Sequence, residues 1–127
     1  MNSQQKTSTK VLCIEDERFI SELYARALVN AGYDIKVIYS GQDGLQEARS
    51  NGYDIILLDL MIPDILGVEV LKRLRAEMPD LKAKIVITTN LEQDEQTRAA
   101  IERQADAYLI KADITPKQLV AFLDKLK

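Results

Sequence analysis

Short apolar runs alternate along this chain with longer segments in which apolar residues recur at helical spacing. The apolar runs, rich in Ile, Leu, Val and Thr, lie at 10–14, 34–39, 54–59, 84–89 and 107–110. The segments with helical spacing lie at 19–31, 45–48, 68–77, 92–103 and 116–126. Short apolar runs predict strands, and recurrence every three or four residues predicts amphipathic helices.

Five strands that alternate with five helices predict an α/β fold with a parallel sheet, helices on both of its faces and right-handed crossovers. Residues 10–127 are enough for one compact domain. Residues 1–9 are polar and without periodicity, so we expect a flexible N-terminal tail. The helix expected over 92–103 has its clearly apolar residues confined to 99–101, and we expect it to be the least firmly packed.

Composition and charge narrow the class of protein. The chain has 17 basic and 20 acidic residues and a net charge of −3, without a basic block, which argues against direct nucleic-acid binding. It has no apolar run long enough to cross a membrane and no signal-peptide core near Met1, so a cytoplasmic protein is expected. The single Cys13 lies inside an apolar run, which predicts a buried side chain and excludes an intramolecular disulfide.

The absence of histidine from the sequence restricts the chemistry further. It excludes His-based acid–base catalysis, Ser-His and Cys-His nucleophile pairs, and imidazole metal ligands. Any bound metal must therefore be a hard cation with oxygen ligands.

The central apolar run, 54–59, ends in an acid, and Pro63 then prevents a simple continuation of the strand. Taken alone, Asp59 could just as well cap the following turn. Polar residues also close or follow three other strands: Glu15 and Asp16, Thr88 and Thr89, and Lys111. Because the C-terminal ends of inner parallel strands share one crevice, we expect these side chains to converge.

Such a cluster indicates phosphoryl chemistry. Carboxylates a few ångströms apart repel one another unless a cation lies between them, and with oxygen ligands only, Mg²⁺ is the natural cation. A carboxylate beside Mg²⁺, a lysine and a hydroxyl can attack a phosphoryl group and stabilise the charge on its oxygens. The pattern therefore predicts reversible formation of an aspartyl phosphate on Asp59.

These motifs resemble the receiver domain of two-component response regulators over residues 10–126. The resemblance implies a flavodoxin-like (βα)5 fold, a doubly wound five-stranded parallel sheet of order 2-1-3-4-5, with the receiver domain over 10–127. It implies that Asp59 is the phosphoacceptor, that Glu15 and Asp16 are the acidic pair with Asp16 a direct Mg²⁺ ligand, and that the backbone carbonyl of Met61 reaches the metal.

The resemblance also implies the residues that respond to phosphorylation. Thr89 has the family's usual spacing from both Asp59 and Lys111 and matches the switch hydroxyl, and Tyr108 matches the switch aromatic. Asp59, Thr89 and Lys111 would promote phosphorylation and dephosphorylation of the protein itself, which is otherwise not an enzyme. The sequence departs from the family at Asn90, where a small residue is usual, and at Ala112, where proline is usual.

The implied partners are a histidine kinase or phosphotransfer protein as phosphoryl donor, and a downstream protein that binds the face formed by the fourth helix, fifth strand and fifth helix. Homodimerisation on phosphorylation is a second expected output. Because no output domain follows Lys127 in this sequence, we expect a stand-alone, single-domain type, with a fragment of a longer regulator as the open alternative. The alternative is a phosphorylation-independent pseudo-receiver that acts as a protein-interaction module.

Two enzyme or carrier classes fit less well. A phosphohydrolase with an aspartyl nucleophile would need a second acid at the position of Met61. A flavin carrier would need a phosphate-binding loop after the first strand, where the acids at 15–17 would repel that phosphate.

Overall fold

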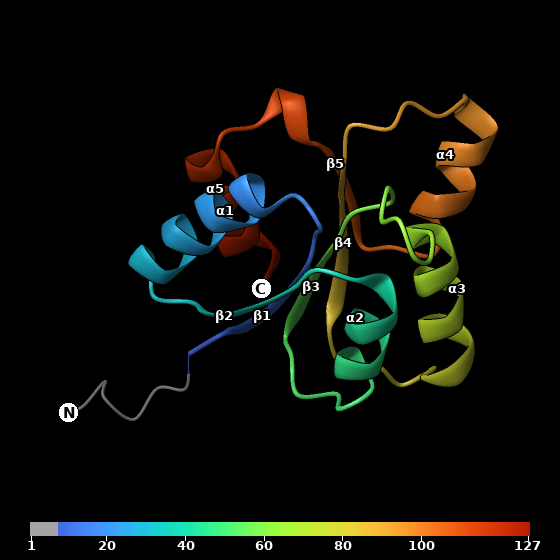
Figure 1. Ribbon diagram of the computed structural model, residues 1–127, viewed down its shortest axis with the longest axis horizontal. Coiled ribbons are helices and arrows are strands. Elements are labelled where there is room, and N and C mark those ends of the chain that lie inside the picture. Colours follow the sequence, from blue (N-terminus) through green and yellow to red (C-terminus); the bar gives the residue numbers. More distant parts are fainter. Residues whose placement is uncertain (1–7) are drawn as a thin grey trace.

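A computed structural model describes residues 8–127, so most of the tail expected over 1–9 lies outside the described residues. Within the described part, strands and helices alternate as predicted (Figure 1). The strands are β1 (Lys10–Ile14), β2 (Asp34–Ile38), β3 (Ile55–Leu58), β4 (Lys84–Thr89) and β5 (Ala107–Ile110). The helices are α1 (Arg18–Asn30), α2 (Gly41–Ala48), α3 (Gly67–Glu77), α4 (Glu95–Glu102) and α5 (Pro116–Leu126), with a 3-10 turn, η2, at Lys111–Asp113.

The five strands form one parallel sheet of order β2-β1-β3-β4-β5, which confirms the predicted flavodoxin-like topology. β3 lies at the centre, and all four of its residues are buried. Strands buried on both faces are expected to be continuously apolar, which explains the unbroken Ile-Ile-Leu-Leu run at Ile55–Leu58.

Each face of the sheet is covered by its own helices, as Figure 1 shows. On one face α2, α3 and α4 contribute Leu45, Leu71, Leu74 and Ile101 to the core. On the other, α1 and α5 contribute Tyr24, Leu28, Leu119 and Leu123. Alternate residues of each strand supply the two cores, because successive side chains of a strand point to opposite faces.

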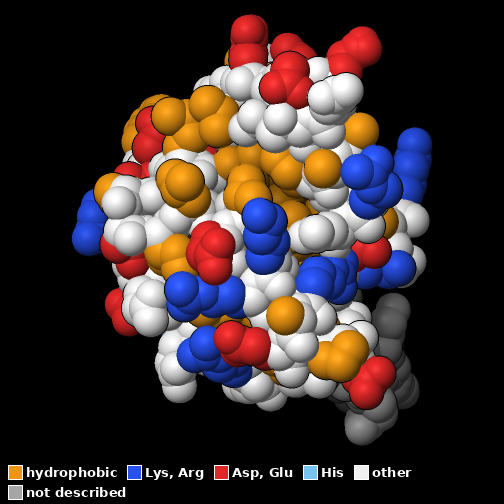
Figure 2. All heavy atoms as spheres, turned by 90° about the vertical axis from the view of Figure 1, so that its right-hand side faces the viewer, with side chains coloured by type: hydrophobic (Ala, Val, Ile, Leu, Met, Phe, Trp, Pro, Cys, Tyr) orange, Lys and Arg blue, Asp and Glu red, His pale blue; other side chains and the backbone are white. Residues whose placement is uncertain are grey.

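Helix α4 begins later than the sequence pattern predicts, at Glu95 rather than at residue 92. The reason is a cap: Asp94 accepts hydrogen bonds from the Thr97 amide at 2.7 Å and from its hydroxyl at 2.9 Å. Only Ile101 of α4 is buried, which agrees with the expected weak anchoring. Figure 2 shows a hollow lined by hydrophobic side chains on the face of the molecule that carries α3 and α4.

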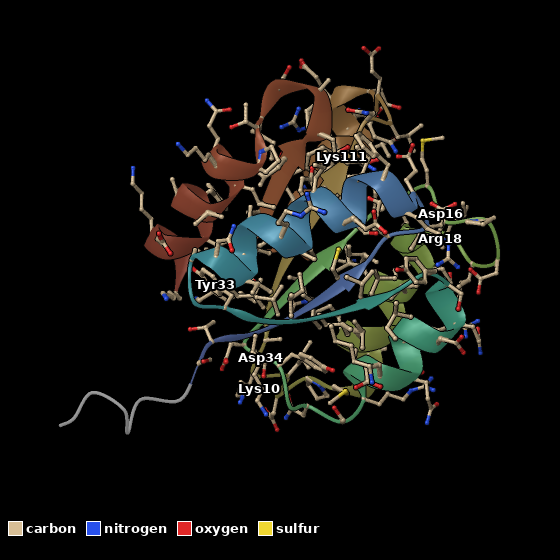
Figure 3. The ribbon with its side chains drawn as sticks, turned by 60° about the vertical axis from the view of Figure 1, so that its left-hand side comes forward. Lys10, Asp16, Arg18, Tyr33, Asp34 and Lys111 are labelled. Atoms are coloured by element: carbon tan, nitrogen blue, oxygen red, sulfur yellow. The ribbon has the colours of Figure 1, made fainter. Side chains whose placement is uncertain are left out.

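At the N-terminal ends of the strands, β1 and β2 each begin with a charged residue. Lys10 starts β1 and Asp34 starts β2, and Figure 3 shows both at this end, away from Asp16 and Lys111. The Asp34 amide donates to the carbonyl of Thr9 at 2.9 Å. None of the helices described over residues 8–127 has the length and apolarity needed to traverse a lipid bilayer.

Candidate functional site

The sheet register brings the predicted polar residues to one edge. Ile14 pairs with Leu58, and Leu58 pairs with Ile87, so the residues that follow β1 and β3 emerge side by side. The next positions in these strands are Glu15 and Asp59, which are 1% and 2% exposed. The chain therefore buries two carboxylates at the centre of the sheet edge, where an unpaired charge would be unfavourable.

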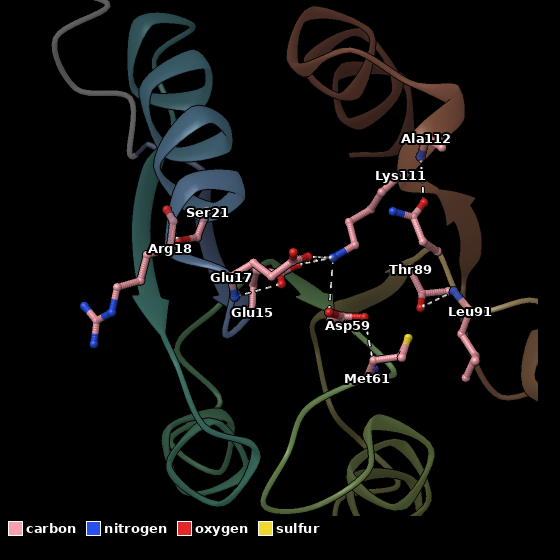
Figure 4. A network of polar contacts seen from close by, with 11 residues as sticks. Glu15, Glu17, Arg18, Ser21, Asp59, Met61, Thr89, Leu91, Lys111 and Ala112 are labelled. Atoms are coloured by element: carbon pink, nitrogen blue, oxygen red, sulfur yellow. Dashed lines mark hydrogen bonds and ion pairs between the residues drawn. The ribbon is translucent and has the colours of Figure 1, made fainter.

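Lys111 provides the compensating charge. Its ammonium Nζ lies 2.7 Å from Glu15 Oε1, 3.1 Å from Asp59 Oδ2 and 3.2 Å from Glu17 Oε1 (Figure 4). The Lys111 side chain is buried like those of Glu15 and Asp59, whereas Glu17 is exposed. Lys111 follows β5 at once and begins η2, and this position directs its side chain back across the edge of the sheet.

Burial and charge oppose each other in this cluster. Burial raises the pKa of Glu15. The hydrogen bond from Lys111 lowers that pKa, and the negative charge of Asp59 raises it further. Burial alone would lower the pKa of Lys111, but the hydrogen bond with Glu15 and the charge of Asp59 outweigh it, so that pKa is raised. Lys111 is therefore held as an ammonium at neutral pH.

The carboxylates form a group that could hold a cation. Oxygens of Glu15, Glu17 and Asp59 lie within 4.8 Å of one another. One ammonium faces three carboxylates, so the site has an excess of acidic groups, and these hard oxygen donors suit Mg²⁺. The residues present therefore fit a magnesium ion.

The adjoining pocket has a volume of about 320 Å³ and is lined by Asp16, Glu17, Asp59, Met61, Asn90 and Lys111. Asp16 and Met61, both predicted from the sequence, thus line the same pocket as Asp59. The three carboxylates that converge are those of Glu15, Glu17 and Asp59, and Asp16 lines the pocket beside them. The Met61 amide donates to Asp59 Oδ1 at 3.1 Å, which orients the carboxylate, and the Met61 side chain is 53% exposed.

The loop after Asp59 folds back closely over the backbone of residues 59 and 60. A Cβ atom on Gly67 would lie 2.2 Å from the backbone oxygen of Asp59 and 2.6 Å from Cα of Leu60. The Gly67 amide also donates to the Leu60 carbonyl at 3.1 Å. This close backbone approach explains why glycine occupies position 67, where α3 begins.

Thr89 and Tyr108 lie on the same face of the sheet, and a single residue links them. Thr89 is fully buried, and its Oγ1 accepts a hydrogen bond from the Leu91 amide at 3.1 Å. The Tyr108 hydroxyl donates to the Leu91 carbonyl at 3.4 Å, and the ring is already buried in this structure. Thr88, the neighbouring hydroxyl, points to the opposite face of the strand.

Two residues of the site were not predicted as functional from the sequence. Glu17 joins the cluster because its own amide donates to Glu15 Oε2 at 3.1 Å, which turns the chain back between β1 and α1. The run of three acids was a signal for it. Asn90 accepts a hydrogen bond from the Ala112 amide through Oδ1 at 2.8 Å. The coincidence of two unusual residues, Asn90 and Ala112, was the available signal.

Comparison with known proteins agrees with this geometry. Among curated proteins, the response regulator ArlR of Staphylococcus saprophyticus is 36% identical over 103 residues, which cover 81% of this chain and 46% of ArlR. ArlR of Staphylococcus haemolyticus is 35% identical with the same coverage. The chain thus spans less than half the length of these curated relatives.

Solved structures give the same result for the fold. The receiver domain of the Francisella response regulator 1452 superposes with a TM-score of 0.82 at 26% identity, covering 94% of this chain and 96% of that one. The response regulator TrrA from Thermotoga maritima, solved in complex with Mg²⁺-BeF, gives 0.79 at 29% identity, with coverage of 94% and 99%. The family profile described as the response regulator receiver domain matches residues 11–124. The chain therefore belongs to the response regulator receiver domain family.

Proposed function

We propose that this protein is a signalling switch in which Asp59 accepts a phosphoryl group in the presence of Mg²⁺. The observation that supports this most strongly is the buried Lys111 ammonium, 3.1 Å from Asp59 Oδ2 and 2.7 Å from Glu15 Oε1. A nucleophilic carboxylate, a cation for the transferred group and further carboxylates for a metal share one pocket.

The proposed donor is the phosphohistidine of a histidine kinase or of a phosphotransfer protein. An oxygen of Asp59 forms the new P–O bond while the P–N bond of the donor breaks, and the imidazole nitrogen keeps the electron pair. Lys111 neutralises charge on the phosphoryl oxygens. Mg²⁺ would neutralise that charge further, held by Asp59 with Glu15, Asp16 and the carbonyl of Met61. The protein acts stoichiometrically and promotes only its own phosphorylation and later hydrolysis.

The signal is proposed to leave the site through Thr89. Movement of this hydroxyl toward a phosphoryl oxygen stretches its hydrogen bond with the Leu91 amide, and the Leu91 carbonyl holds the Tyr108 hydroxyl. Phosphorylation therefore shifts the β4–α4 loop and the equilibrium position of the Tyr108 ring together.

The output surface is proposed to be the face formed by α4, β5 and α5. The Arg98 guanidinium of α4 lies 4.4 Å above the Tyr108 ring of β5, so a change in that ring alters this surface. Ile101 is the one buried residue of α4, and a helix so weakly anchored can shift at low cost. A downstream protein or a second copy of the chain would bind the shifted surface.

Beryllofluoride, which mimics a phosphoryl group on a carboxylate, gives a direct test. The ¹⁵N-labelled protein is titrated with beryllofluoride and Mg²⁺, and amide resonances of Asp59, Thr89 and Lys111 are expected to shift. Asp59→Asn should abolish these shifts without changing the fold. Unmoved resonances in the wild-type protein would instead favour the phosphorylation-independent interaction module.

A further inference from the structure

Asn90 forms a bridge between two strand ends on the rim of the phosphoryl pocket. It follows Thr89, the last residue of β4, and its Oδ1 accepts a hydrogen bond from the Ala112 amide at 2.8 Å. Ala112 follows Lys111, so this bond ties the β4–α4 loop directly to the turn that holds the lysine. Asn90 lines both the pocket that contains Asp59 and the neighbouring cavity beside Tyr108, so its side chain stands on the wall between the two.

The bond to Ala112 identifies the two ends of the Asn90 side-chain amide. A backbone N–H can only donate, so the atom that it contacts must be the oxygen of the side-chain amide. The Nδ2 group, with two N–H donors, is therefore the other branch of a side chain whose orientation is set. Over residues 8–127 this Nδ2 group makes no hydrogen bond.

We propose that Asn90 Nδ2 donates a hydrogen bond to an oxygen of the phosphoryl group on Asp59. This inference rests on the function proposed above. It assigns donors of three kinds to the phosphoryl group: the ammonium of Lys111, the hydroxyl of Thr89 and the amide of Asn90.

A neutral donor suits this pocket. Lys111 is already shared among Glu15, Glu17 and Asp59, and a second ammonium would be drawn to the same carboxylates. An amide has no net charge, so it stays available for the phosphoryl oxygens. Because its Oδ1 holds the Ala112 amide, the same side chain also couples the phosphoryl group to the turn that carries Lys111.

The test compares the affinity for beryllofluoride at saturating Mg²⁺ among four forms of the full chain. Asn90→Ala removes the donor and the bridge, and its affinity should fall about tenfold or more, the usual effect of losing a hydrogen bond to a charged group. Gln93→Ala is the matched control, because Gln93 lies in the same loop but lines a neighbouring cavity rather than the pocket of Asp59. Its affinity should stay within twofold of wild type.

Asn90→Asp separates the donor from the bridge. Aspartate keeps an oxygen that can accept from the Ala112 amide, so slow hydrogen exchange at Ala112 should persist, and it should be lost in Asn90→Ala. The beryllofluoride affinity of Asn90→Asp should nevertheless fall at least as far as that of Asn90→Ala.

Three outcomes would overturn the inference. Wild-type affinity in Asn90→Ala would show that the amide does not contribute to binding. Wild-type affinity in Asn90→Asp would show that only the bridge matters. Failure of the wild-type protein itself to bind beryllofluoride would overturn the proposed function as well, and so is distinguished from the first two.

Discussion

Replacing Lys111 by methionine should destabilise the protein more than any exposed lysine substitution. The ammonium is within 3.2 Å of three carboxylates, two of them buried. Methionine fills a similar volume but leaves Glu15 and Asp59 without their cation. Removing one partner from a buried ion pair costs roughly 3–5 kcal/mol, a large part of a total stability of about 5–15 kcal/mol.

The size of this loss should depend on pH. The folded-state pKa of Glu15 is raised, chiefly by burial, and the Lys111 hydrogen bond is what limits that rise. A carboxyl whose pKa is raised on folding stabilises the folded state at pH values below its pKa in the unfolded chain, about 4.3 for glutamate. That stabilisation is lost as the pH rises through the pKa of the folded state. Without Lys111 the pKa of Glu15 rises further. The difference between variant and wild type should therefore shrink as the pH falls from neutral toward about 4.3.

Urea unfolding without Mg²⁺, at neutral pH and again under acidic conditions, measures both effects. Lys82→Met is the matched control: Lys82 lies 3.6 Å from Asp54, both side chains are largely exposed, and the loss should stay below about 0.5 kcal/mol. Added Mg²⁺ should restore part of the stability of Lys111→Met, because it supplies the missing positive charge. A loss below about 1 kcal/mol at neutral pH, or a loss that does not change with pH, would show that Lys111 does not compensate the buried carboxylates.

Three further predictions concern the surroundings of the site and the core. Gly67→Ala should cost roughly 3 kcal/mol of stability and weaken beryllofluoride binding, because the new Cβ would lie 2.2 Å from a backbone oxygen. Gly52→Ala is the control and should change stability little, because its nearest contact is at 3.5 Å. Similar melting curves for both variants would contradict this prediction. Asp64 accepts the amides of α2 residues 41 and 42 at 2.8 and 2.9 Å, so Asp64→Ala should cost about 1 kcal/mol in urea unfolding at neutral pH. Burial tends to raise the pKa of the Asp64 carboxyl, but the hydrogen bonds from the backbone amides outweigh burial, and that pKa is lowered. The stability that Asp64 contributes is therefore present above about pH 3.9 and is lost as the pH falls below that value. Burial and the 2.6 Å hydrogen bond to Asp124 raise the pKa of Tyr33, so wild type should lose stability above about pH 10, and Tyr33→Phe should lose less; equal alkaline slopes would exclude this role.

The sheet could be predicted closely because its strands are defined by local patterns. β1, β4 and β5 begin and end as the apolar runs predicted, and β3 is shorter by one acid at each end. Leu58 is the last residue of β3 in register with Ile14 and Ile87, and the Asp59 amide still donates to the Ile14 carbonyl at 3.1 Å, so the acid emerges directly at the strand end. The start of α4 was predicted too early because the Asp94 side chain accepts a hydrogen bond from the Thr97 amide and so caps the helix at residue 94.

At the site, sequence reasoning identified the residues at strand ends, because strand register determines where they emerge. It could not place residues whose position depends on the path of a loop. Glu17 reaches Lys111 only because the chain turns back between β1 and α1. The Asn90–Ala112 hydrogen bond joins two loops that are far apart in the sequence, and no periodicity in either loop specifies it.

The most direct test of the central claim is covalent modification of Asp59. The protein is incubated with Mg²⁺ and acetyl phosphate, a small phosphodonor, and its intact mass is measured. We expect the addition of one phosphoryl group in the wild-type protein, and none in Asp59→Asn or when Mg²⁺ is chelated. An unmodified wild-type protein, or equal modification of Asp59→Asn, would show that Asp59 is not the phosphorylated residue.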